Sequence, residues 1–350
     1  DGDELVFEHT QNDLLFTSNL DNKNNYQSQR IPITELSISG YVALNSMKGE
    51  GQDTVLNFPD VYQLYNTYPF HFDKSFDTKN SYRSKSMLAT SLDNVNGENI
   101  GVIQLINKKG GTKQNIQFDK DDETVLSSFA DLAAVHIERA RITKEMILRM
   151  IKMAELRDPK ETGAHVNRVG AYSAELYEHW AMKNDIPKNE IKQMKGNYRL
   201  ASMLHDVGKV GISDIILKKP GPFTDEERKL MQQHTVFGTE LFKYSTSEMD
   251  RLATKISLSH HENWDGSGYP YGRGKSPDTV MERENIPLSG RIVKITDVYD
   301  ALMSIRCYKK AWDEQKVLDE IEKKSGIEFD PFLVTCFFDI YETIKAIQVK

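Results

Sequence analysis

The sequence predicts an α+β protein with more than one domain: an N-terminal antiparallel sheet with helices, a long linker helix, and a C-terminal bundle built only of helices. Three observations predict this class. The chain has 350 residues, which is more than one domain usually holds. Short apolar runs alternate with polar turns up to about residue 120, as in a sheet. From Asp121 onward, apolar residues recur every three, four or seven positions, as in helices.

The clearest element of the first part is a hairpin. Residues 86–92 and 100–106 are strand-like runs on either side of Asn96-Gly97. Asn-Gly is the dipeptide that two-residue hairpin turns favour, since both of its residues tolerate positive φ. We therefore predict two antiparallel neighbouring strands here.

A long helix is predicted to link the two parts, over residues 123–157. Its stripe is interrupted by His136 and Thr143. The helix could pack against the domains on either side, or it could form a parallel homodimer that carries a signal between them. Both remain open, and a homodimer through this helix is our working prediction. The apolar stripe consists of Leu126, Phe129, Ala133, Ile137, Ala140, Ile147, Met150 and Ala154.

The rest of the chain is predicted to be helical. Pro220-Gly221-Pro222 is a firm break, after which Thr224 and Glu227 form a capping box. That box should open a helix that continues through His234. Further helices are expected at residues 248–261, 288–304 and 313–324, with an irregular loop rich in Gly and Pro at 266–287.

Histidines and carboxylates of this second part indicate metal binding. A single histidine in a helix is more often structural than a ligand, but here several independent motifs agree. His205-Asp206 is followed by the pair His260-His261, and Asp297 lies inside an apolar helical run. Imidazoles and carboxylates together suit a cluster of divalent metals, which can activate water and neutralise a phosphate. The histidines in apparent ligand positions are His165, His205, His234, His260 and His261.

The composition of the chain indicates its cellular compartment and argues against one class of partner. Hydrophobic residues make up 39% and charged residues 28% of the chain, which is typical of a globular protein. The net charge of −7 argues against non-specific binding of DNA or RNA. The two cysteines, Cys307 and Cys336, form no paired motif, and no signal peptide or membrane segment is visible, so we expect a cytoplasmic protein. The chain starts at Asp1 without a methionine, from which we expect a longer protein.

Several stretches follow one another in a specific order. They are residues 162–169, residues 205–209, His234, residues 260–262 with 266–270, and residues 297–302 followed by Arg306, Tyr308 and Lys309. In this order they resemble an HD-GYP domain, a branch of the HD metal-dependent phosphohydrolases, over residues 158–350. The resemblance implies an all-helical bundle that hydrolyses cyclic di-GMP to linear pGpG, with GMP as a further product, through a hydroxide that bridges two metals.

The resemblance also implies the metal ligands. The first metal would be bound by His165, His205, Asp206 and Asp297. Asp206 would bridge to a second metal bound by His234, His260 and His261. Glu161 would bind a third metal, although Asp158 and Glu161 also fit a capping box. The expected cofactors are two or three divalent ions. A set of imidazoles and carboxylates without thiolates fits iron or manganese, with zinc, cobalt and nickel left open, and the resemblance favours non-haem iron, alternatively manganese.

Other residues are expected to act on the substrate. Asp206 and Lys209 are the expected catalytic residues, with Lys209 placing its charge on a substrate phosphate or near the leaving oxygen. Arg306 and Lys309 would bind the phosphate backbone or a guanine edge. Tyr269 and Pro270 would shape the substrate-binding loop beside the metals. Asp300 is interpreted as a residue of the helix surface or an outer partner of the ligands, and Asp297 is preferred as the ligand.

The first part resembles a GAF domain with less specificity. The residues that carry this resemblance are 100–108 and 118–123, with Leu126, Phe129 and Ala130. It implies a sensory domain over residues 1–122, without the opening helix of that fold and with an unknown ligand. Three alternatives to a cyclic di-GMP phosphodiesterase remain open: another HD-type phosphohydrolase, a di-iron oxygenase, and a catalytically weak cyclic di-GMP receptor.

Overall fold

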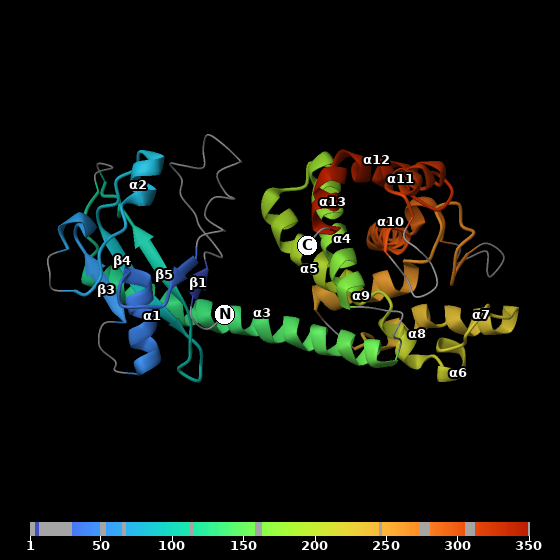
Figure 1. Cartoon of the computed structure of the whole chain (residues 1–350), viewed down its shortest axis with the longest axis horizontal. Helices are drawn as coiled ribbons and strands as arrows, with labels where there is room; N and C mark the ends of the chain where they lie inside the picture. Colours follow the sequence, from blue (N-terminus) through green and yellow to red (C-terminus); the bar gives the residue numbers. More distant parts are fainter. Residues whose placement is uncertain are drawn as a thin grey trace. The chain divides into compact units, whose positions relative to one another are not determined.

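The computed structural model describes residues 4–6, 30–49, 54–64, 68–111, 115–157, 163–244, 247–272, 281–304 and 312–348. The chain forms two compact units, Asp1–Thr143 and Lys144–Lys350 (Figure 1). Strands lie in the first unit and the second is helical, which confirms the α+β class. The division falls inside the single long helix α3 (Lys120–Arg157), so the long helix is also confirmed. Domain limits at residues 122 and 157 stay a prediction.

The first unit is centred on a three-stranded antiparallel sheet. Its order is β3 (Val55–Phe58), β4 (Met87–Asp93) and β5 (Asn99–Ile106). The predicted hairpin is confirmed, because β4 pairs with β5 around a turn in which Gly97 has a φ of 76°. A separate two-stranded ladder joins β1 (Glu4–Val6) and β2 (Arg30–Pro32).

Strand β4 is buried on both faces. Met87 and Ala89 belong to the cluster that includes Val42 of α1 (Ile38–Lys48). The alternate residue Leu88 packs with Leu126 of α3. Successive side chains of a strand point to opposite faces, so α1 and the first part of α3 cover opposite sides of β4. In the described part of this unit, two short helices also occur, η2 (Val61–Gln63) and α2 (Ser75–Asn80).

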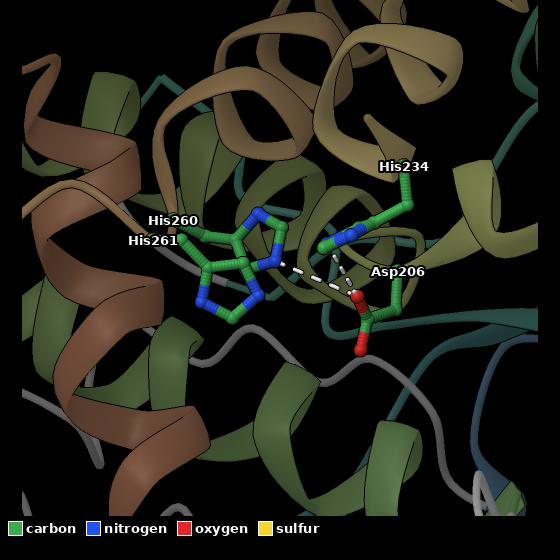
Figure 2. A group of neighbouring side chains, drawn as sticks. All are labelled: Asp206, His234, His260 and His261. Carbon is green, nitrogen blue, oxygen red and sulfur yellow. Dashed lines mark ion pairs between the residues drawn. The ribbon is translucent and has the colours of Figure 1, made fainter. Parts of the chain in front are cut away.

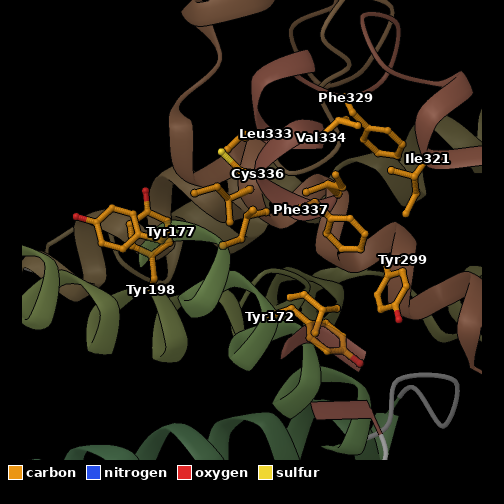
Figure 3. Packing of buried hydrophobic residues seen from close by; sticks show 14 of the residues in the cluster. Tyr172, Tyr177, Tyr198, Tyr299, Ile321, Phe329, Leu333, Val334, Cys336 and Phe337 are labelled. Atoms are coloured by element: carbon orange, nitrogen blue, oxygen red, sulfur yellow. The ribbon is translucent and has the colours of Figure 1, made fainter. Parts of the chain in front are cut away.

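The second unit is a helical bundle with two buried clusters. The larger one surrounds Tyr172, Tyr299 and Phe337 (Figure 3). The other includes Ile147 and Ile151, so the last part of α3 belongs to this bundle. The helices are α4 (Gly163–Lys183), α5 (Lys188–Ser202), η3 (Val207–Gly211), α6 (Asp214–Leu217), α7 (Asp225–Gln232), α8 (His234–Glu240), α9 (Glu248–Ser259), η5 (Arg283–Asn285), α10 (Leu288–Met303), α11 (Glu314–Lys323), α12 (Pro331–Asp339) and α13 (Tyr341–Gln348).

One predicted helix is interrupted. The capping box of Thr224 and Glu227 is present and starts α7, but α7 ends at Gln232 and a new helix begins at His234. Nδ1 of His234 lies 2.7 Å from the carbonyl oxygen of Met231, and the Thr235 hydroxyl donates to that of Gln232 at 2.9 Å. In a continuous helix, these two carbonyl oxygens would accept hydrogen bonds from backbone N–H groups. Here the side chains of His234 and Thr235 compete for them. No helix among the described residues is long and apolar enough to span a bilayer.

Candidate metal centre

A close approach of two backbones places the first pair of candidate ligands. Asp206 immediately precedes η3, and His234 begins α8. A Cβ atom at Gly208 of η3 would lie 1.9 Å from the carbonyl oxygen of His234 and 2.4 Å from the nitrogen of Gly238. Only glycine permits this spacing, because a Cβ atom cannot come so close to another backbone. The packing brings the ring of His234 to the carboxylate of Asp206.

Asp206 and three histidines form one ligand group. Nε2 of His234 lies 3.1 Å and Nε2 of His260 lies 3.6 Å from Oδ1 of Asp206 (Figure 2). His261 completes the group, in which one ligand atom from each residue lies within 4.8 Å of the others. The end of α9 delivers both adjacent histidines, since His260 is its C-terminal cap.

A second ligand group lies on the other side of Asp206. It consists of His165, His205 and Asp297, again with ligand atoms within 4.8 Å of one another. Nε2 of His165 is 3.4 Å from Oδ1 of Asp297, which α10 supplies. Nε2 of His205 is 3.4 Å from Oδ2 of Asp206. The two oxygens of Asp206 thus face different groups: Oδ1 faces His234 and His260, and Oδ2 faces His205.

The hydrogen bonds of three rings fix their tautomer. Nδ1 of His205 lies 2.9 Å from the Ser202 carbonyl oxygen, and Nδ1 of His260 lies 3.0 Å from that of Ile256. His234 makes the equivalent contact with Met231. A carbonyl oxygen can only accept, so Nδ1 carries the proton and Nε2 of a neutral ring keeps its lone pair. All three lone pairs belong to the ligand groups, which is the arrangement that a metal requires.

A buried carboxylate orients the fourth ring. Oδ2 of Asp300 accepts from Nδ1 of His165 at 2.7 Å, and Asp300 is fully buried. Arg168 donates to both oxygens of Asp300, at 2.6 and 2.8 Å, and to the Ser304 hydroxyl at 2.9 Å. Asp300 therefore holds His165 with Nε2 towards Asp297. The interpretation of Asp300 as a surface residue is wrong, whereas its interpretation as an outer partner of the ligands agrees with these contacts. Arg168 was missed as a member of the site.

Electrostatics keep the candidate ligands in the forms that bind cations. Burial alone would raise the pKa of Asp206, but the charges of Lys209 and His205 outweigh it and hold that pKa well below its usual value. Burial likewise opposes the ionisation of Asp297, yet its hydrogen bond from His165 and the charge of His205 lower its pKa. Burial lowers the pKa of His260 and, more strongly, that of His261. The site thus favours ionised carboxylates at Asp206 and Asp297 and neutral rings at His260 and His261.

The structure describes three of the other predicted site residues: Lys209, Tyr269 and Pro270. Nζ of Lys209 lies 2.7 Å from Oδ2 of Asp206, beside the ligand groups. The ring of Tyr269 stacks on His261 with centroids 4.7 Å apart, and Pro270 follows it through a cis peptide bond. Three further predicted residues lie outside the described part of the chain: Glu161, Arg306 and Lys309.

Lys294 is a neighbour of the site that the sequence did not single out. It lies in α10 three residues before Asp297, which places both on the same face of the helix. Burial lowers its pKa, against the opposing charges of Glu328, Asp297 and Glu262. The sequence does not show whether a lysine within an apolar run points to solvent or towards a site. Only the tertiary packing shows the surroundings of Lys294.

Two family models match the chain and overlap in helix α3. The model of the HD domain family matches residues 127–333, and the GAF domain model matches residues 28–137. Similar proteins include the 3'3'-cGAMP-specific phosphodiesterase 2 of Vibrio cholerae, 36% identical over 214 residues that cover 61% of this chain and 38% of that protein. A cyclic di-GMP phosphodiesterase of the same organism is 39% identical over 57% of this chain and 40% of its own length.

The cyclic di-GMP phosphodiesterase of Thermotoga maritima is 40% identical, over 57% of this chain and 50% of that protein. The matched region thus spans half or less of each of these relatives. The HD family model, by contrast, matches more than half of this chain, and it includes His165, the His205-Asp206 pair and Asp297. Both resemblances noted in the sequence are confirmed, and the chain belongs to the HD domain family.

Proposed function

We propose that this protein is a metal-dependent phosphodiesterase that hydrolyses cyclic di-GMP to pGpG, with GMP as a further product. The observation that carries the proposal is the position of Asp206 between two ligand groups. A carboxylate with one oxygen near His205 and the other near His234 and His260 is suited to bridge two cations. Two relatives named cyclic di-GMP phosphodiesterases support the choice of substrate.

The residues fit two divalent ions. His165, His205, Asp206 and Asp297 would hold one, and Asp206, His234, His260 and His261 would hold the other. The ring nitrogens that face Asp206 carry lone pairs, and the set contains no thiolate, so iron or manganese fits its chemistry. A third ion at Glu161 stays a prediction. When bound, such ions lower the pKa of water and neutralise charge on a phosphate.

The chain's own residues prepare the site for this chemistry. Asp300 and the backbone carbonyls behind His205, His234 and His260 fix the rings, so that little reorganisation is needed during the reaction. Lys209 is close enough to Asp206 to place its positive charge beside a scissile phosphate. Tyr269, stacked on His261, would form one wall of the substrate site. Arg306 and Lys309 are proposed to bind the remainder of the nucleotide.

Substrate hydrolysis by matched variants tests the proposal. Purified protein loaded with Fe²⁺ or Mn²⁺ under anaerobic conditions should convert cyclic di-GMP to pGpG. His205→Ala should abolish turnover while circular dichroism shows an intact helical fold. His179→Ala is the control, because that partly exposed histidine contacts Asp339 away from the ligand groups. Unchanged turnover in His205→Ala would refute the metal mechanism, and binding without hydrolysis by the wild type would support the receptor alternative.

A second substrate is favoured by one specific comparison. One similar relative is named a 3'3'-cGAMP-specific phosphodiesterase. The same metal centre could hydrolyse that molecule, since both substrates contain two phosphodiester bonds in one ring. Side-by-side kcat/KM values for cyclic di-GMP and 3'3'-cGAMP decide between them, and we expect cyclic di-GMP to be preferred.

We also propose that the GAF domain regulates hydrolysis and that α3 forms a homodimer, with domain limits near residues 122 and 157. Val125, Phe129, Leu132 and Met146 of α3 are each more than half exposed and recur at intervals of three, four or fourteen. Apolar residues at such heptad intervals are typical of a helix that pairs with another copy. Phe129→Glu should convert a dimer to a monomer in analytical ultracentrifugation. A wild-type protein that is monomeric at assay concentrations would refute the homodimer.

A further inference from the structure

The side chain of Glu262 links the turn after His261 to the loop that follows it. Glu262 is the next residue after His261 and is only 2% exposed. The backbone N–H of Tyr271, nine residues further along, donates to Oε1 of Glu262 at 2.6 Å. Burial of a carboxyl group is unfavourable unless hydrogen bonds compensate for the lost water, and a backbone N–H provides such a bond. The contact therefore joins a candidate ligand's neighbour to a separate part of the loop.

That loop carries Tyr269, whose ring lies against two rings of the same ligand group. It stacks on His261 with centroids 4.7 Å apart and lies edge-on to His234 with centroids 6.3 Å apart. The backbone N–H of Tyr269 donates to the carbonyl oxygen of His261 at 3.4 Å, which is long for such a bond. Pro270 has no N–H group to add. The bond from Tyr271 to Glu262 is thus the shorter of the two links on either side of Pro270.

Backbone packing fixes the loop at an earlier position. A Cβ atom at Gly268 would lie 2.3 Å from the backbone nitrogen of Asn263 and 2.5 Å from the carbonyl oxygen of His261. At Gly268 the loop therefore lies directly against the turn that follows His261. Three positions later, at Tyr271, a side chain makes the link to the same turn, that of Glu262. Tyr269 lies between these two attachment points.

We propose that Glu262 is a positioning residue, whose carboxyl group holds Tyr269 against His261 and thereby sets the affinity of the site for its substrate. The proposal rests on the proposed function, in which Tyr269 forms one wall of the substrate site, and extends it to a residue that acts through Tyr269. The partner of Glu262 is a backbone N–H, so the role requires an oxygen that accepts a hydrogen bond. Glutamine retains such an oxygen and alanine does not.

Exchange of the Tyr271 amide hydrogen measures this link independently of activity. In metal-loaded protein, mass spectrometry with electron-transfer fragmentation should show exchange about tenfold faster in Glu262→Ala than in the wild type, as expected for the loss of one such hydrogen bond. Glu262→Gln should keep the slow exchange. Metal content and circular dichroism should match the wild type in both variants. Unchanged exchange in Glu262→Ala would overturn the proposal, and loss of metal would overturn it in favour of a structural role.

A double-mutant cycle on cyclic di-GMP hydrolysis tests whether Glu262 acts through Tyr269. Glu262→Ala and Tyr269→Leu should each raise KM about tenfold and change kcat less, and the double variant should have the KM of Tyr269→Leu alone. Glu262→Gln should keep the wild-type KM. Additive effects on KM would overturn the proposal. Equal KM values in Glu262→Gln and Glu262→Ala would also overturn it, because the charge of Glu262 would then matter and not its hydrogen bond.

The control is Glu284→Ala, which removes an exposed acid from η5. It should leave both the exchange of the Tyr271 amide and KM at wild-type values. Effects as large as those of Glu262→Ala would overturn the proposal, because the loss of an acid that lacks this contact would then suffice. Wild-type protein that does not hydrolyse cyclic di-GMP would instead refute the proposed function, and the exchange of the Tyr271 amide would still decide whether Glu262 holds the loop.

Discussion

The contact between η3 and α8 can be tested with a single methyl group. In Gly208→Ala the new Cβ would lie 1.9 Å from the His234 carbonyl oxygen, whereas ordinary van der Waals contact begins at 3.4 Å. The neighbouring atoms belong to the backbone, so the two elements must separate by more than an ångström. Nε2 of His234 now lies 3.1 Å from Oδ1 of Asp206, and this distance should grow with the separation. Overpacking of this kind costs about 1–3 kcal/mol of the free energy of unfolding.

The assay for Gly208→Ala combines urea unfolding with metal analysis. We expect lower stability and loss of the metal held by His234, His260 and His261. The matched control is Gly196→Ala in α5, where nothing lies within 4 Å of the added Cβ. There the same methyl group should stabilise the protein by about 0.4–1 kcal/mol, because alanine has less freedom in the unfolded chain. Full metal content and wild-type stability in Gly208→Ala would refute the argument that close backbone packing positions His234.

The remaining predictions concern the ligands and their supports. Asp300→Asn should weaken metal binding about 10- to 100-fold in a chelator competition, since it removes the charge behind His165, and wild-type affinity would contradict this. Removal of metal from the wild type should lower the melting temperature reversibly, because an ion at 100 times its Kd stabilises the fold by about 2.7 kcal/mol. A metal-free protein with the same melting temperature as the metal-loaded protein would contradict this prediction, because it would show that bound metal does not stabilise the fold. Burial raises the pKa of Asp300, but His165 and Arg168 hold it below the ordinary value. The stability that Asp300 adds should therefore be complete above about pH 3.9 and should fall at lower pH, so that urea unfolding of wild type and Asp300→Asn differs less in acid. A constant difference would exclude the ion pair as its source.

The sequence motifs contain the residues that the structure brings into the two ligand groups, but they do not reveal the residues that support them. His260-His261 and His205-Asp206 are pairs of neighbouring residues whose side chains commonly bind metals. Their capacity to bind a metal can therefore be recognised from the sequence alone. Asp300 is different, because its neighbour Asp297 is equally acidic and only the packing of α10 against α4 shows which of them orients His165. The helix interruption before His234 likewise depends on side-chain hydrogen bonds that compete with the backbone.

The predicted long helix and hairpin show where local patterns suffice. Gly97 adopts the positive φ of the turn between β4 and β5, and the apolar repeat after Asp121 needs no partner to be recognised. Lys294 marks the opposite limit. Its position in a helix follows from the sequence, but two of the acids whose charges act on it, Glu262 and Glu328, lie more than 30 positions away.

The most direct test of the central claim is the metal content of anaerobically purified wild type and Asp206→Ala, measured together with cyclic di-GMP turnover on the same samples. If Asp206 connects the two ligand groups, the wild type should hold at least two iron or manganese ions per chain and hydrolyse cyclic di-GMP. Asp206→Ala should lose turnover and at least one ion while its circular dichroism spectrum stays helical. Full metal content with undiminished turnover in Asp206→Ala would contradict the account.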